Sequence, residues 1–184
     1  MDRLQRALGG IAILAGLLVF PGAVRAQEDY SFSVAGLGSL GGSLDADPGD
    51  EVTNSGYQLN LGMVTDKRTM VVLRLGRLGL DAEESFGTLT DADLTYATIG
   101  GEYRFDETWY DSGAYIALGG YRLEGTALDG VADRQSSLGL AVGITGEFKV
   151  NPWLGVLLEL SGHYVDFDEA QLFAMAHGGF AFHF

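Results

Sequence analysis

The sequence ends in the stretch AQLFAMAHGGFAFHF, residues 170–184. Counted back from the carboxyl end, every second residue is apolar or small, which is the period of a β-strand with one apolar face. The opposite face is mixed and carries Gln171, His177 and His183. The stretch therefore predicts a strand with one side suited to hydrocarbon and the other to polar surroundings. The apolar side comprises Phe184, Phe182, Phe180, Gly178, Ala176, Ala174 and Leu172.

The amino-terminal segment has the features of a cleavable signal peptide. Two arginines precede an apolar run at residues 11–20, and a small-x-small cleavage site ends at Ala26. The apolar run is shorter than the about 20 residues that a helix needs to span a bilayer. We therefore expect a signal peptide at residues 1–26 and a single mature domain at residues 27–184.

Composition narrows the function classes. The 184 residues include 28 glycines and no cysteine, and their formal net charge is −14. Without cysteine, disulfides, thiolate metal sites and an amino-terminal lipid anchor on cysteine are excluded. The predicted signal peptide carries a charge of +2, so the mature chain carries −16 and has no basic patch to neutralise the phosphates of a nucleic acid. We expect no nucleic-acid partner, no cofactor and no metal centre.

In eight segments of the mature chain, apolar and polar residues alternate with a period of two. The connections between these segments are alternately short and, for the most part, longer. The short connections lie near residues 66–68, 106–108 and 151–152 and are typical of hairpins. An even number of strands returns both termini to the same side of a barrel. The pattern predicts an all-β fold, an eight-stranded antiparallel up-and-down transmembrane β-barrel. The expected strands cover residues 29–40, 54–65, 69–80, 93–105, 110–124, 136–149, 153–165 and 170–184.

Charged side chains alternate with apolar ones inside the predicted strands, as at Glu147, Glu159 and His163. Such groups are costly against hydrocarbon but are suited to a polar lumen. The sequence therefore predicts an apolar outer wall and a polar interior, the reverse of a soluble barrel. The side chains assigned to the lumen could form a connected ion-pair network, and a polar plug is favoured over ion conduction because buried charges must be paired. They are Arg74, Glu102, Arg104, Arg122, Glu124, Glu147, Glu159 and His177.

Two strands test this assignment. In the strand at 110–124 this assignment predicts that the tyrosines point outward, towards lipid. In the strand at 69–80 the apolar face also carries Arg77, while Arg74 lies on the other face. Either a bulge near Gly76 or a position of Arg77 at the level of the lipid head groups would explain this strand.

Alternating aromatic residues that close on a terminal Phe resemble the C-terminal signature of bacterial outer-membrane β-barrels. In that family the barrel-assembly machinery reads the signature, so the resemblance implies an assembly role for Phe180, Phe182 and Phe184. With its eight strands and polar lumen, the mature chain resembles the small barrels of outer membrane protein A and outer membrane protein X. The resemblance implies a monomer in the bacterial outer membrane, in contact with lipid and lipopolysaccharide, with both termini in the periplasm.

Aromatic residues gather near the short connections, at one end of the predicted barrel. We expect Tyr103, Phe105, Trp109 and Trp153 to form part of an interfacial girdle at that end.

One group of residues could carry chemistry. Ser161, His163 and Glu159 could form a hydrolase-like set, and some eight-stranded outer-membrane barrels are lipid A deacylases or palmitoyltransferases. However, Ser161-Gly162-His163 runs in the opposite order to the deacylase pattern, and His163 is predicted to face the lumen. A lumen-filling role is therefore favoured over catalysis.

The acidic connections are the last candidate. Asp45, Asp47, Asp50 and Glu51 could gather a divalent cation but lack the twelve-residue calcium-loop pattern, so a solvated charged loop is favoured. Bridging by Mg²⁺ or Ca²⁺ to lipopolysaccharide phosphates is a hypothesis. The leading functional prediction is a non-enzymatic outer-membrane protein that contributes to envelope integrity or surface interaction. The alternatives are a narrow channel or small-ligand carrier and, third, a lipid A modifying enzyme.

Overall fold

The computed structural model describes residues 31–44, 54–80, 89–106, 109–127, 130–167 and 170–184. The predicted signal peptide and the acidic residues 45–51 lie outside the described residues. No helix in the described part of the chain is long and apolar enough to cross a membrane.

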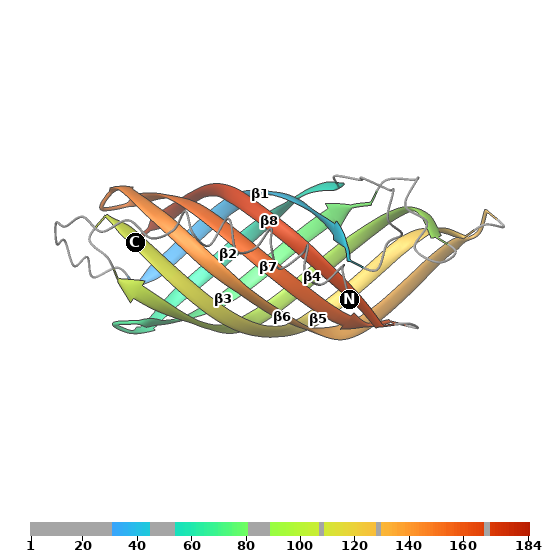
Figure 1. Cartoon of the computed structure of the whole chain (residues 1–184), viewed down its shortest axis with the longest axis horizontal. Coiled ribbons are helices and arrows are strands. Elements are labelled where there is room, and N and C mark those ends of the chain that lie inside the picture. Colours follow the sequence, from blue (N-terminus) through green and yellow to red (C-terminus); the bar gives the residue numbers. More distant parts are fainter. Residues whose placement is uncertain (1–30, 45–53, 81–88, 107–108, 128–129, 168–169) are drawn as a thin grey trace, which may run out of the picture.

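Eight antiparallel strands close into a single barrel, as the sequence predicts (Figure 1). Each strand pairs with its neighbours in the sequence, and the last pairs with the first. The strands are β1 (Phe32–Ser43), β2 (Asn54–Asp66), β3 (Thr69–Gly79), β4 (Leu89–Asp106), β5 (Tyr110–Ala127), β6 (Ala132–Asn151), β7 (Leu154–Asp166) and β8 (Ala170–His183).

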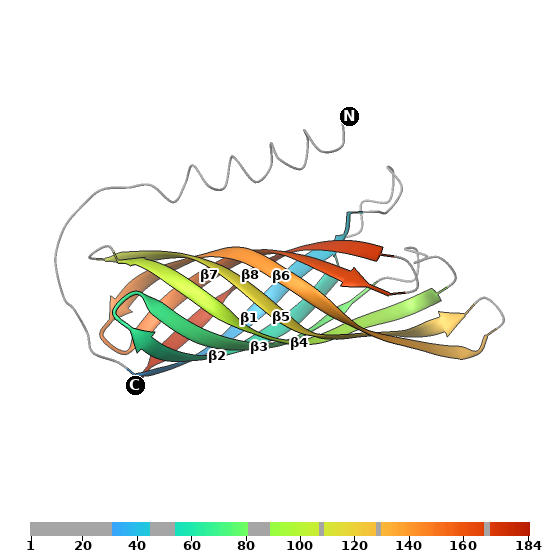
Figure 2. The same ribbon diagram turned by 90° about the horizontal axis from the view of Figure 1, so that it is seen from below.

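The two ends of the barrel differ. The β2–β3, β4–β5 and β6–β7 connections and the carboxyl terminus lie at one end, here called the turn end; the opposite end is the loop end. Strands β5 and β6 contain 18 and 20 residues, more than the about 9–11 that cross a bilayer. They project farthest at the loop end (Figure 2). Their predicted bounds were too short because backbone pairing continues to Thr126 and Ala132, where the apolar alternation has ended.

The outer wall of the barrel is apolar. Ile116, Leu118 and Leu138 on β5 and β6 are exposed over 59%, 63% and 79% of their surfaces. Residues of opposite parity are buried inside the barrel, among them Thr145 and Glu147. This inversion of the usual soluble pattern is what the alternation of the sequence predicts, and it is the arrangement expected of a barrel surrounded by lipid.

The carboxyl-terminal strand closes the barrel. β8 pairs with β7 on one side and with β1 on the other, with Gly36 opposite Phe180 and Val34 opposite Phe182. The backbone N–H of Phe184 donates to the carbonyl of Phe32 at 2.9 Å. Because both edges of β8 are paired, no strand edge remains open along this seam.

Strand β3, for which the sequence allowed either a bulge near Gly76 or an outward-facing Arg77, is continuous. Gly76 pairs with Gln58 on β2 and with Tyr96 on β4 without a shift of register. Arg77 lies on the outer wall and its guanidinium bonds the Asp93 carboxylate at 2.6 Å. Of the two explanations, the bulge near Gly76 is therefore wrong, and Arg77 occupies the outer wall.

The predicted orientation of β5 is wrong. Tyr115, Tyr121 and Leu123 are buried inside the barrel, whereas Arg122 and Glu124 lie on the outer wall with side chains 43% and 44% exposed. Both faces of this strand carry apolar residues, so its alternation does not fix its orientation, and a shift by one residue exchanges the faces. The Arg122–Glu124 pair lies near the loop end, where a charged pair on the outer wall need not meet hydrocarbon.

The β1–β8 seam supplies a matched pair of glycines for a stability test. A Cβ atom added to Gly179 would lie 2.0 Å from the carbonyl oxygen of Gly36, whereas a Cβ on Gly36 meets nothing within 4 Å. We expect Gly179→Ala to destabilise the barrel by about 1–3 kcal/mol, the cost of overpacking. Gly36→Ala should change stability little. Urea unfolding in detergent micelles measures both; equal stability of the two variants would contradict the close approach at this seam.

Candidate functional site: the filled barrel interior

A buried guanidinium lies at the centre of the interior. Arg74 on β3 is 0% exposed; its Nη2 donates to Glu102 of β4 at 2.6 Å and its Nε to Glu159 of β7 at 3.2 Å. Its Cζ atom lies 3.6 Å from the ring centroid of Tyr115 on β5, a cation–π distance. Two carboxylates and one aromatic ring from three other strands therefore surround this cation.

Glu159 receives hydrogen bonds on both carboxylate oxygens. Gln58 and Tyr115 donate to Oε1 at 3.1 and 2.8 Å, and Asn60 and Arg74 donate to Oε2 at 3.2 Å each. A buried charge is tolerated when it is paired and its lone pairs are used, and both conditions hold here. Both carboxylate oxygens of Glu159 therefore accept hydrogen bonds from within the network.

A second group of charges lies between Arg74 and the turn end. Arg104 contacts Glu147 at 3.3 Å, Glu102 at 3.5 Å and Asp111 at 3.8 Å. Lys149 contacts Asp111 at 3.1 Å, and His183 of the closing strand bonds Glu147. Because Glu102 contacts both Arg74 and Arg104, the two groups form one continuous ion-pair network.

A chain of hydrogen bonds crosses the lumen between Ser39 on β1 and Tyr121 on β5. His177 Nδ1 is 2.7 Å from Ser39 Oγ, and His177 Nε2 is 3.0 Å from Ser161 Oγ. Ser161 Oγ is 2.8 Å from His163 Nε2, and His163 Nδ1 is 2.8 Å from Tyr121 OH. All five side chains are buried. This polar chain fills the lumen on the loop-end side of the charged network.

The hydrolase-like set does not assemble. Ser161 and His163 are in contact, but the remaining nitrogen of His163 bonds Tyr121, and the carboxylate of Glu159 accepts from Gln58, Asn60, Arg74 and Tyr115. No carboxylate orients the histidine as a hydrolase base requires. Ser161 is also shared between two histidines within the lumen, so these side chains are placed to fill it.

The loop end of the interior is closed by an apolar cap, which was not predicted. Leu78, Leu94 and Phe173 are fully buried at its centre. Its members come from the loop-end portions of β3, β4, β5, β7 and β8 and from the residues that directly follow β3 and β7, and the cluster includes the rings of Tyr96 and Tyr121. The other members are Leu80, Ala92, Leu123, Val165, Phe167 and Met175.

The predicted lumen residues therefore fall into two groups. Arg74, Glu102, Arg104, Glu147, Glu159 and His177 lie inside, whereas Arg122 and Glu124 lie outside and form a separate pair at 2.5 Å. The prediction missed Gln58, Asn60, Asp111, Tyr115 and His183. The alternation of β2 could have found Gln58 and Asn60, since both lie on the face opposite Leu59 and Leu61.

The aromatic residues assigned to the membrane interface and to assembly lie on the outer wall. Tyr103, Phe105, Trp109 and Trp153 are exposed near the turn end, and the rings of Trp153 and Phe182 stack with centroids 6.4 Å apart. Phe180 and Phe182 are exposed on β8, and Phe184 is exposed directly after it. Among the described residues, no cluster of three or more histidines or acidic residues could hold a metal ion.

Neither a protein-family model nor a curated protein matches the sequence, but several solved structures do. The chain superimposes on Neisserial surface protein A with a TM-score of 0.69 and 15% identity, over 83% of this chain and 97% of that one. Ail, the attachment invasion locus protein of Yersinia pestis, matches with a TM-score of 0.55 and 19% identity over 86% and 100%. The outer membrane protein OprG from Pseudomonas aeruginosa matches with 0.55 and 13% over 88% and 99%.

These neighbours are small eight-stranded outer-membrane barrels. The chain therefore has the fold of the outer membrane protein A and outer membrane protein X type, as the sequence resemblance implied. At identities below 20%, the likeness shows the fold and leaves the function to the chemistry of the site.

Removing one member of the network should be far more costly than breaking an ion pair on the outer wall. We expect Arg74→Ala to destabilise the barrel by about 3–5 kcal/mol, because it leaves Glu102 and Glu159 buried without their cation. The control is Arg77→Ala two residues along β3, which removes an exposed pair and should cost at most about 1 kcal/mol. Urea unfolding in micelles measures both, and similar losses would contradict a central role for Arg74.

Proposed function

We propose that the chain is a non-enzymatic integral protein of the bacterial outer membrane. Its barrel is closed to solutes, and the protein contributes to envelope integrity or to surface interactions through the connections at the loop end. The observation that carries the proposal is the filled interior within an apolar wall. The ion-pair network, the polar chain from Ser39 to Tyr121 and the apolar cap succeed one another along the lumen. The turn end would then face the periplasm, as would both termini.

The filled interior argues against a channel or small-ligand carrier. An eight-stranded barrel is just wide enough for its side chains to fill, and here charged pairs occupy the centre while Leu78, Leu94 and Phe173 occupy the loop end. An ion entering from the loop end would have to cross apolar side chains and then displace paired charges.

The closed lumen is tested by conductance. Folded protein inserted into planar bilayers should give no stable single-channel openings in molar salt, because no continuous aqueous path crosses the cap. The folded fraction is verified beforehand by heat-modifiable migration on a detergent gel. Reproducible openings of fixed conductance would contradict the proposal and favour the narrow channel.

Lipid A modification is tested separately. The lipid A of cells that express the protein should have the same mass profile as lipid A from cells without it, since Ser161 and His163 lie inside the barrel and lack an orienting carboxylate. A new deacylated or palmitoylated species that disappears in the Ser161→Ala and His163→Ala variants would overturn the non-enzymatic assignment.

We further propose that Phe184 acts in assembly by the barrel-assembly machinery and that Tyr103, Phe105, Trp109 and Trp153 lie at the periplasmic interface. Phe184→Ala should lower the folded fraction in the outer membrane severalfold, while in vitro refolding into micelles is little changed, because the backbone bonds of residue 184 remain. Phe32→Ala is the control, since Phe32 is also exposed at the turn end. Equal folded fractions of both variants in cells would argue against an assembly signal at Phe184.

A further inference from the structure

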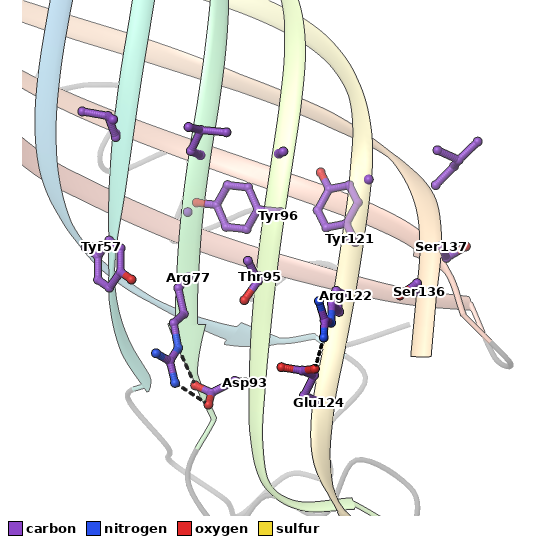
Figure 3. A pocket seen from close by; sticks show the side chains of 16 residues that line it. Tyr57, Arg77, Asp93, Thr95, Tyr96, Tyr121, Arg122, Glu124, Ser136 and Ser137 are labelled. Atoms are coloured by element: carbon purple, nitrogen blue, oxygen red, sulfur yellow. Dashed lines mark hydrogen bonds and ion pairs between the residues drawn. The ribbon is translucent and has the colours of Figure 1, made fainter. Parts of the chain in front are cut away.

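The outer wall of the barrel is hollowed near the loop end. A groove of about 1120 Å³ runs across the outer faces of β2 to β6 (Figure 3). Its floor is formed by small residues, Ala97 on β4 and Gly120 on β5, and a Cβ atom built on Gly120 meets nothing within 4 Å. Exposed Tyr57 stands on one side of the groove and exposed Leu138 on the other. Small residues between larger ones thus leave space on the wall.

The groove changes character along the barrel axis. Its part nearer the turn end is lined by Leu59, Leu75 and Leu138, which continue the apolar band of the wall. Its part nearer the loop end is lined by two ion pairs, Arg77–Asp93 and Arg122–Glu124, which Figure 3 shows on either side of Thr95. A groove with an apolar part that ends between two guanidinium groups has the shape and chemistry to bind an acyl chain joined to an anionic head group.

Three of the chain's cations lie at or beside this groove, paired with the carboxylates of Asp93 and Glu124. Eight lysines and arginines follow residue 26. Arg74, Arg104 and Lys149 contact buried carboxylates, and Lys67 and Arg68 lie in the β2–β3 turn. The remaining three are on the outer wall towards the loop end: Arg77 and Arg122 line the groove, and Arg134 bonds Glu124 of its lining at 2.6 Å.

The two lining arginines remain available to a ligand. Their side chains are 51% and 43% exposed, and each shares an exposed ion pair with one carboxylate. Exposed pairs of this kind contribute little energy and exchange readily. The planar guanidinium presents five N–H donors and suits the oxygens of a phosphate. Three arginines share the carboxylates of Asp93 and Glu124 here, so this group of ion pairs carries one more positive than negative charge, in a chain whose net charge is −14.

We propose that this groove binds one phosphorylated lipid of the leaflet at the loop end, with an acyl chain over Ala97 and Gly120 and the phosphate on Arg77 and Arg122. The proposal rests on the membrane placement proposed above. Continuity of the apolar lining with the lipid-facing wall favours a lipid over a soluble phosphate compound, and the hollow floor favours a single chain in a fixed position over general contact with the bilayer.

The test is native mass spectrometry of the protein released from detergent, with phosphatidylglycerol and the diacylglycerol of the same acyl chains as probes. Wild-type protein should retain one phosphatidylglycerol, at least fivefold more often than diacylglycerol. Gly120→Leu fills the floor and should lower this retention at least fivefold. The Arg77→Gln, Arg122→Gln double variant should lower phosphatidylglycerol retention to the level of diacylglycerol.

The matched control is Gly36→Leu on β1, across the barrel, where an added Cβ also meets nothing within 4 Å; it should retain lipid like the wild type. Retention unchanged by Gly120→Leu, lowered equally by Gly36→Leu, or equal for the two lipids would overturn the proposal. A dimer of the wild-type protein that Gly120→Leu dissociates would overturn it in favour of a second copy in the groove. A chain that stays folded and soluble without detergent would instead overturn the membrane function, and the lipid site with it.

Discussion

The structure depends on the pairing of Arg74 inside a closed wall. A guanidinium without water needs carboxylates with good geometry, and Glu102, Glu159 and Tyr115 supply two charges and a ring from three other strands. Arg74 and Glu159 lie on strands that do not pair with each other, so this ion pair joins two walls across the interior of the closed barrel. Burial of the cation therefore draws on side chains from several strands at once.

The same wall separates two environments and determines what the molecule can do. Outside, apolar side chains suit hydrocarbon; inside, charges, histidines and a final apolar cap succeed one another along the described lumen. The proposed function therefore lies at the surface of the wall and at the connections at the loop end. The groove between Tyr57 and Leu138 lies on that surface, where the apolar band gives way to Arg77 and Arg122.

Much of this architecture could be predicted from the sequence because membrane barrels must satisfy every backbone group and alternate strictly. The number of strands follows from the eight alternating segments. The faces of β6 and β7 follow from charges such as Glu147 and Glu159 set among apolar neighbours, and the face of β8 follows from its alternating phenylalanines. The face of β5 did not follow, because Tyr115, Ile116, Leu118 and Tyr121 make both sides apolar. The partners of Arg74 and the apolar cap also depend on strand register, which a period of two does not specify.

Strand β5 offers the sharpest test of an apolar wall that faces lipid around a filled interior. The natural chain has no cysteine, so single spin labels can be placed along β5 in lipid bilayers. Labels at Ala114, Ile116 and Leu118 should collide with oxygen dissolved in the lipid and not with a water-soluble nickel complex, while a label at Ala117 should be immobile and accessible to neither. Nickel access at Ile116 and Leu118, or oxygen access at Ala117, would show that these faces of β5 do not meet lipid and the filled interior respectively.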